Sequence, residues 1–230
     1  MKCLEVELLS LFPEYFQSPL EVSMLKRAQE KGLLKVSLTD IRDFSQERFS
    51  KVDDRPYGGG PGMVMMADPL VRAIRAKKRV GSKVVYLSPQ GRTLDAKKAK
   101  SLAECEHIVL VCGHYEGIDQ RVIESDIDEE ISIGDYVLTN GCLAALVLLD
   151  CMVRFVPGVL GDDEGSKFDS FESGLLDWPH YTRPEEYEGR KVPAVLLSGN
   201  HKEIQVWRKA RAEEKTKTVR PDLWRLKGGE

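Results

Sequence analysis

The sequence predicts an α/β fold, with a mostly parallel sheet flanked by helices and a small, mainly helical unit behind it. The first observation is that β-rich runs alternate with helix-like segments through the first two thirds of the 230 residues. Such alternation is typical of parallel strands connected by helices. The second is a stretch rich in Gly, Ser and Asp, at 158–175, with little hydrophobic periodicity. We therefore expect two folded parts joined by a linker.

The predicted strands are short runs rich in Val, Ile, Leu and Tyr: 4–12, 34–41, 83–89, 107–113 and 128–134. The predicted helices have apolar residues every three to four positions: 13–31, 67–79, 93–104 and 117–125. Thr93 is the predicted N-cap of the third of these helices.

A fifth helix is predicted for "GCLAALVLLDCMVRF" at 141–155. Asn140 is a suitable N-cap, and "VPG" at 156–158 ends the run. Because residues 143–149 are apolar almost all round, we expect the helix to be deeply buried and partly covered by a second subunit. The domain prediction is therefore a sheet domain at 1–157, a flexible linker at 158–175 and a helical domain at 176–230.

Composition excludes several classes of protein. Glu5 and Glu7 interrupt the first apolar run, so we expect no secretory signal, and no uncharged stretch approaches the roughly 18 residues of a membrane helix. The cysteines at 3, 105, 112, 142 and 151 have no zinc-site spacing. Reduced thiols in the cytoplasm are the simplest interpretation.

The charge is unevenly distributed along the chain. Between residues 124 and 188 there are sixteen Asp and Glu against three Lys and Arg, a net charge of −13. The total is −3, which leaves +10 for the remainder. This asymmetry permits an anionic partner such as RNA, although the charge alone favours solvated helix faces.

Three predicted strands are followed by glycine-containing turns, at 86–92, 112–119 and 132–141. In an open parallel sheet, ligands bind beyond the carboxyl ends of the strands. Glycines there allow a ligand to approach the backbone closely, so the three turns predict a shared pocket. The chain has no P-loop, and "YGGGPGM" at 57–63 lacks dinucleotide-loop spacing. A flexible loop is the main interpretation of that stretch, with phosphate binding as the second.

Several long motifs occur in a characteristic order along almost the whole chain. They are "PYGGGPGMVM" (56–65), "YLSPQG" (86–91), "CGHYEGID" (112–119), "SIGDYVL" (132–138), "DSF" (169–171), "LLDWPHYTRP" (175–184) and "LLSGNH" (196–201). Together they resemble the bacterial tRNA (guanine-N1)-methyltransferases, which modify guanosine 37, the nucleotide 3′ of the anticodon in tRNA.

The resemblance implies a fold and a set of partners. It implies a SPOUT methyltransferase domain with a C-terminal trefoil knot, a rarity that no hydrophobic pattern predicts. It also implies S-adenosyl-L-methionine as the methyl donor and a homodimer with active sites at the subunit interface. Mg²⁺ is implied as well, without assigned ligands.

The resemblance also assigns residues to the donor pocket, one turn at a time. The implied donor-binding residues are Tyr86, Leu87, Ser88, Pro89, Gly113, Tyr115, Glu116, Gly117, Ser132, Ile133, Gly134, Asp135, Tyr136, Val137, Leu138 and Gly141. Among these, Glu116 and Asp135 are secondary candidates, as carboxylates that could favour the donor's positive charge or hold Mg²⁺.

The implied catalytic residues are Asp169, as general base, and Arg154, as the cation beside guanine O6. Guanine N1 carries a proton, and an unperturbed Asp, with a pKa of about 3.9, is a weak base for it. A cation near O6 stabilises the negative charge that develops there, which makes N1–H more acidic. Without the resemblance, Asp169 would be interpreted as a linker charge.

For tRNA, we expect phosphate contacts from Lys and Arg of the first domain and of residues 202–227. His180, Tyr181 and Arg183 are candidates for the cleft that receives the base, or for structural roles. Asn140 and Cys142 depart from the family pattern, where a glycine and a glutamate are usual, and we expect modestly altered donor affinity. The alternatives are a knotted methyltransferase acting at another RNA position and a non-catalytic RNA-binding protein.

Overall fold

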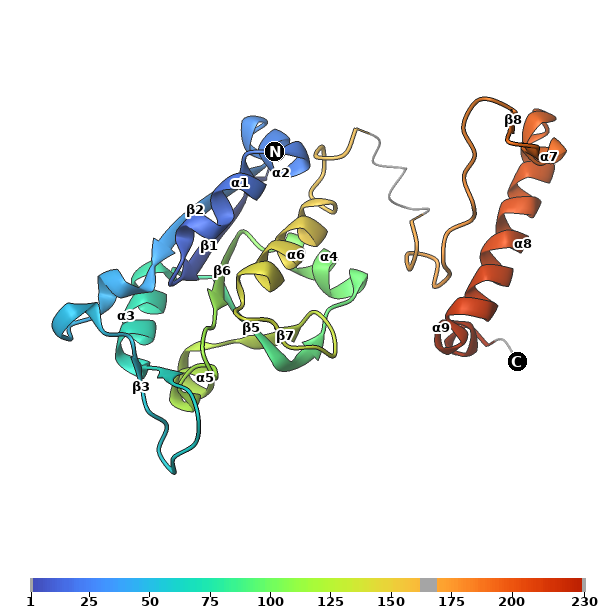
Figure 1. Cartoon of the computed structure of the whole chain (residues 1–230). Helices are drawn as coiled ribbons and strands as arrows, with labels where there is room; N and C mark the ends of the chain where they lie inside the picture. Colours follow the sequence, from blue (N-terminus) through green and yellow to red (C-terminus); the bar gives the residue numbers. More distant parts are fainter. Residues whose placement is uncertain (1, 162–168, 229–230) are drawn as a thin grey trace. The chain divides into compact units, whose positions relative to one another are not determined.

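The computed structural model describes residues 2–161 and 169–228, and the chain divides into two compact units, Met1–Gly161 and Asp162–Glu230 (Figure 1). Residues 162–168 of the predicted linker lie outside the described residues. The domain boundaries at 157 and 175 stay predictions. Within the described residues, no helix is both long enough and apolar enough to span a membrane.

The first unit contains a five-stranded parallel sheet with the order β2-β1-β6-β5-β7. Its strands are β1 (Leu4–Ser10), β2 (Leu34–Asp40), β5 (Lys83–Thr93), β6 (His107–Cys112) and β7 (Glu129–Ser132). All five predicted strands are confirmed. A parallel sheet needs a crossover between successive strands, which explains why helical segments separate them in the sequence.

Helices cover both faces of the sheet. One buried cluster joins α2 (Ser23–Glu30), α4 (Ala96–Ala103) and α6 (Cys142–Val153) to one face. A second cluster joins α3 (Ala67–Lys77) and α5 (Gln120–Asp126) to the other. Shorter elements complete this unit: η1 (Pro13–Phe16), α1 (Gln17–Leu20), η2 (Ile41–Phe44), η3 (Arg48–Ser50), β3 (Asp53–Asp54) and β4 (Val64–Met65). The predicted α/β class, with helices flanking a parallel sheet, is therefore confirmed, whereas the knot stays a prediction.

Two helix predictions need correction. The helix predicted at 13–31 is divided into η1, α1 and α2, because Ser23 has a positive φ of 50° that interrupts the helical path. Thr93 is the last residue of β5 and caps nothing. The side chain of Asp95 instead accepts a hydrogen bond from Lys98 N at 2.7 Å and caps α4.

Helix α6 is apolar, and part of it is completely buried. Leu148, Leu149 and Met152 have no exposed surface, whereas Leu143 and Val147 are 44% and 48% exposed. Its first turn is held by Asn140, whose Oδ1 accepts a hydrogen bond from Cys142 N at 2.9 Å. Asn140 thus acts as predicted, although the N-cap position itself belongs to Gly141.

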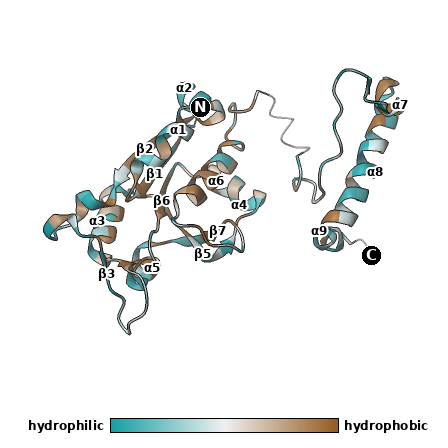
Figure 2. Cartoon of the chain, in the orientation of Figure 1, coloured by the Kyte–Doolittle hydropathy of each residue, from teal (hydrophilic) through white to brown (hydrophobic). Residues whose placement is uncertain are grey.

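The second unit is mainly helical. Its elements are β8 (Glu186–Tyr187), β9 (Arg190–Lys191), α7 (Ala194–Leu197), α8 (His201–Val219) and α9 (Pro221–Leu226). Its longest described helix is α8, which begins after the N-cap Asn200, whose Oδ1 accepts a hydrogen bond from Lys202 N at 3.2 Å. Figure 2 shows α8 as hydrophilic along most of its length, in contrast to the apolar α6.

Candidate functional site

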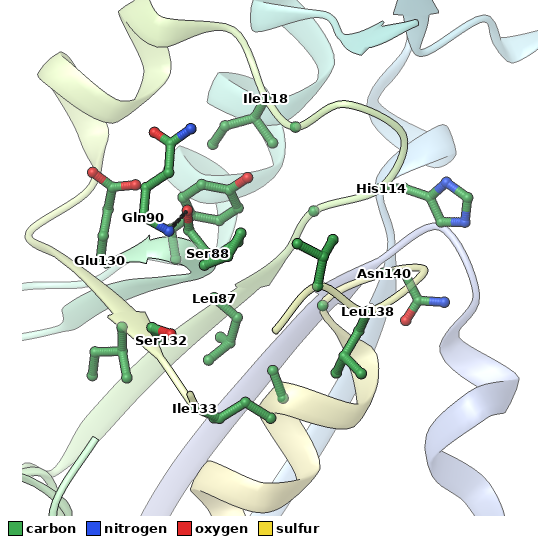
Figure 3. A pocket seen from close by; sticks show the side chains of 18 of the residues that line it. Leu87, Ser88, Gln90, His114, Ile118, Glu130, Ser132, Ile133, Leu138 and Asn140 are labelled. Atoms are coloured by element: carbon green, nitrogen blue, oxygen red, sulfur yellow. Dashed lines mark hydrogen bonds between the residues drawn. The ribbon is translucent and has the colours of Figure 1, made fainter. Parts of the chain in front are cut away.

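The three glycine-containing turns meet at one cavity of about 270 Å³, beyond the carboxyl ends of β5, β6 and β7 (Figure 3). Asp135 is exposed and does not line it. All the other predicted donor-binding residues do: Tyr86, Leu87, Ser88, Pro89, Gly113, Tyr115, Glu116, Gly117, Ser132, Ile133, Gly134, Tyr136, Val137, Leu138 and Gly141. The fold therefore brings together three segments that are far apart in the sequence.

The first turn is an interruption in the pairing of β5 with β7. Leu87 and Arg92 both pair with Ile131, so the intervening residues leave the ladder and turn toward the cavity. A Cβ on Gly91 would lie 2.5 Å from Ile131 N, where no side chain fits. Glycine is therefore needed here because of a close backbone approach.

The second and third turns are attached to each other directly. Gly141 N donates a hydrogen bond to Gly113 O at 2.8 Å, and His114 and Asn140 form an isolated bridge. A Cβ on Gly141 would lie 3.0 Å from both Cys112 Cα and Gly113 N. This close contact fixes the spacing between the two turns.

The third turn is held by its own side chains. Ser132 Oγ donates to Gly134 O at 3.0 Å, and Tyr136 Oη donates to Ile133 O at 3.2 Å. Gly134 has a φ of 148°, and a Cβ there would lie 2.5 Å from Tyr136 Cε1. Tyr136 nevertheless keeps 55% of its surface exposed, so its ring can contact a ligand.

The loop at 57–63 is connected to the second turn at its end, which the sequence did not indicate. Glu116 N donates to Met63 O at 3.0 Å, and Met65 N donates to Gly117 O at 2.9 Å. A Cβ on Gly62 would lie 2.6 Å from Glu116 Cγ. The end of this loop therefore supports the back of the cavity.

Ten further residues that were not predicted to bind the donor also line the cavity: Gln90, His114, Ile118, Gln120, Ile123, Glu130, Ile131, Thr139, Asn140 and Ala144. Glu130 shares its register position with Tyr86 on β5, so the two side chains lie on the same face of the sheet. Knowledge of how β5 pairs with β7 would have identified Glu130 as a lining residue. Burial, followed by the Glu130 carboxylate, raises the pKa of Tyr86 to about 12 and keeps its hydroxyl protonated.

Cys142, which departs from the family pattern, lies behind the cavity and does not line it. Its side chain is 1% exposed, and its Sγ lies 3.2 Å from Ser10 Oγ. A hydrogen bond with the buried Cys112 thiol is the main cause that lowers the pKa of Cys142 to about 7. Cys142 therefore belongs to the packing beneath the second and third turns, and the altered donor affinity expected from it stays a prediction.

The two predicted catalytic residues lie in different units. Arg154 is exposed at the C-cap of α6, and Asp169 is half-buried in the second unit. Their cooperation stays a prediction. The described residues hold no group of three or more His, Cys, Asp and Glu side chains suited to a metal ion, so no Mg²⁺ ligand is assigned.

The second unit has a cavity of its own, of about 430 Å³, whose lining includes His180, Tyr181 and Arg183, the candidates for either the base cleft or structural roles. His180 Nε2 lies 2.7 Å from Asp177 Oδ2. The Arg208 guanidinium carbon lies 4.9 Å from the centre of the Trp178 ring. Aromatic and cationic side chains thus share one concave surface.

Comparison with known proteins gives one family. The profile of the tRNA (Guanine-1)-methyltransferase TrmD family matches residues 4–226. A tRNA (guanine-N(1)-)-methyltransferase of Protochlamydia amoebophila is 65% identical over 218 residues, covering 95% of this chain and 98% of that protein. Proteins of the same name from Chlamydia trachomatis serovar D and Chlamydia muridarum are 56% identical over 221 residues. The chain spans 62% of the length of these two relatives. The chain belongs to the tRNA (Guanine-1)-methyltransferase TrmD family.

Proposed function

We propose that this chain transfers a methyl group from S-adenosyl-L-methionine to N1 of guanosine 37, the nucleotide 3′ of the anticodon, in tRNA. Family membership over residues 4–226 supports the reaction. The observation in this structure that best supports the proposal is the cavity that the three strand-end turns form together.

The cavity has features that suit the donor. Its glycines bring backbone N–H and C=O groups to the surface, where they can hydrogen-bond the adenine edge. Ile133 and Leu138 supply apolar walls for the ring, and Glu116 supplies a carboxylate near the positive charge. The cavity volume is close to the lower end of the usual range for small-molecule sites, about 300–1,000 Å³. When bound, the donor supplies an electrophilic methyl group on a positively charged sulfur.

The residues of this chain prepare the guanine. Asp169 accepts the N1 proton, and Arg154 stabilises the negative charge that develops at guanine O6. The N1 electron pair is then available for the methyl group, with no covalent enzyme intermediate. In this role, both residues act on the guanine and neither is needed to hold the donor.

The partner tRNA and the second subunit are part of the proposal. Helix α8 contains six Lys and Arg, at 202, 208, 209, 211, 215 and 217, and we assign them to phosphate contacts. The partly exposed Leu143 and Val147, with the apolar groove of Val22, Met24 and Leu146, are assigned to the homodimer interface. The cytoplasm is the proposed compartment, consistent with five free thiols.

One assay tests the function. The protein is incubated with labelled donor and with tRNA transcripts that differ only at the nucleotide 3′ of the anticodon. We expect label only on transcripts with guanosine there, at N1. Label on every transcript, or on none, would reject the proposal.

The catalytic assignment has a separate test. We expect Asp169→Ala and Arg154→Ala each to lower the transfer rate by about 100-fold or more, with donor affinity kept within about twofold. The control is Glu172→Ala, an exposed carboxylate near Asp169 in the chain. Near-normal turnover in either catalytic variant would contradict the role of that residue.

The homodimer has its own test as well. Val147→Asp places a charge on the exposed side of α6, and we expect it to shift the protein from dimer to monomer in sedimentation experiments. A variant that sediments as a dimer at the same concentration would rule out this surface as the interface.

A further inference from the structure

Glu130 stands out among the residues that line the donor cavity. It belongs to β7, where it pairs with Tyr86 of β5, and Figure 3 shows its carboxylate at the side of the cavity that also carries Gln90. Among residues 2–161 and 169–228, its Oε2 is the one buried side-chain oxygen or nitrogen without a hydrogen-bond partner. The sequence did not single it out, because it stands within an acidic run.

A buried carboxylate oxygen without a partner is costly, because it has lost its water without gaining a hydrogen bond. Two other polar groups of the cavity lining already have partners: Gln120 Nε2 donates to Glu124 Oε1 at 3.2 Å, and the Gln90 backbone N–H donates to Ser88 Oγ at 3.2 Å. Glu130 itself lines the cavity, so its carboxylate is at hand for a ligand there, although Oε2 is buried before a ligand binds. A binding site is where such an unpaired group is expected.

The opposite face of the same strand provides a contrast. The carboxylate of Glu129 is paired, with Lys98 Nζ at 2.7 Å and Lys83 Nζ at 3.8 Å, and it does not line the cavity. Two successive glutamates therefore have different environments: Glu129 is paired with lysines, and Glu130 lines the cavity with one oxygen unpaired.

We propose that Glu130 is a donor-binding residue, whose carboxylate accepts a hydrogen bond from an N–H or O–H group of the bound methyl donor. This inference rests on the proposed function, since it assumes that the cavity holds the donor. S-adenosyl-L-methionine offers such groups in its ammonium, its ribose hydroxyls and its adenine amino group. Tyr86, which pairs with Glu130 across the two strands, also lines the cavity.

The test measures dissociation constants by calorimetry for the full chain and for Glu130→Gln, Glu130→Ala and the control Glu129→Gln. The ligands are S-adenosyl-L-methionine, S-adenosylhomocysteine, which lacks the positive sulfur, and methylthioadenosine, which lacks the amino-acid part. We expect donor binding to weaken about tenfold in Glu130→Gln, which keeps an amide acceptor, and up to about 100-fold in Glu130→Ala. Glu129→Gln should remain within about twofold, since that carboxylate is paired outside the cavity.

Comparison of the three ligands identifies which group of S-adenosyl-L-methionine donates the hydrogen bond to Glu130. An effect on the first two ligands that disappears with methylthioadenosine assigns the hydrogen bond to the ammonium. An equal effect on all three assigns it to the ribose or the adenine. An effect on S-adenosyl-L-methionine alone would overturn the proposal, because it would indicate attraction to the sulfonium charge without a hydrogen bond.

Melting temperatures separate binding from a purely structural role. Without ligand, Glu130→Gln should melt at or above the wild-type temperature, because it replaces a carboxylate that has one buried, unpaired oxygen by a neutral amide, whereas the donor-induced rise should shrink. Unchanged donor affinity in both Glu130 variants would reject the inference. If the wild type methylates tRNA in the same experiments, that rejection leaves the proposed function intact. A wild type that binds none of the ligands would instead reject the proposed function.

Discussion

Replacing Gly91 by alanine tests whether the first turn is held in place by backbone contact. The added Cβ would lie 2.5 Å from Ile131 N, and also against the Glu130 backbone. Ordinary contacts between such atoms are about 3.5–4.0 Å, so the turn and β7 must separate by about 1 Å. The backbone of Gly91 does not have a left-handed φ, so the whole effect comes from space.

This displacement should affect stability and binding together. Overpacking of this kind costs about 1–3 kcal/mol, which urea unfolding followed by circular dichroism can measure. Because the turn lines the cavity, we also expect donor affinity to fall at least about tenfold in calorimetry, as a 1 Å misplacement is large for a preformed site.

The matched control is Gly161→Ala. A Cβ on Gly161 would meet nothing within 4 Å among the described residues, and its φ is ordinary. Its free energy of unfolding should change by less than about 0.5 kcal/mol. If Gly91→Ala keeps both wild-type stability and wild-type donor affinity, the argument that close packing against β7 shapes the turn is wrong.

Two further predictions concern the core of the first unit. Leu148→Ala, in the fully buried part of α6, should lower the free energy of unfolding by about 2–5 kcal/mol in urea, whereas Leu226→Ala, at an 84% exposed position, should change it by less than about 0.5 kcal/mol. The Arg75 guanidinium, whose Nε and Nη2 bond Asp126 at 2.9 and 3.0 Å, holds the pKa of Asp126 below its usual value. The resulting stabilisation is complete above the unfolded pKa of about 3.9 and is lost as the pH falls through the lower folded value. Asp126→Asn should therefore lower the melting temperature at pH 7, and a difference that persists undiminished well below pH 4 would contradict this linkage.

The sequence was most informative where local chemistry decides the structure. The β-rich runs became the five strands, because burial on both faces of a parallel sheet demands continuous apolar residues. The glycine-containing turns at 86–92, 112–119 and 132–141 met at one cavity, because the carboxyl ends of parallel strands share one edge.

What the sequence could not show depends on contacts between distant segments. The attachment of Gly62 to Glu116 joins residues that no local pattern relates. The interruption in β5 depends on its register against β7, and the break at Ser23 on a left-handed backbone that serine does not signal. The cooperation of Asp169 with Arg154 rests on the resemblance alone and stays a prediction.

The strand order also determines when, during synthesis of the chain, the donor cavity can form. β1 pairs with β6, whose residues are made about a hundred positions later, and the cavity needs segments from Tyr86 to Ala144. At a synthesis rate of about 5–20 residues per second, roughly 3–12 s pass between these two residues. During that interval the apolar ends of β5 and β6 have no covering helix α6. Donor binding by a growing chain would therefore begin only after α6 has been made, and methylation would also wait for the proposed general base Asp169, which follows α6 in the sequence.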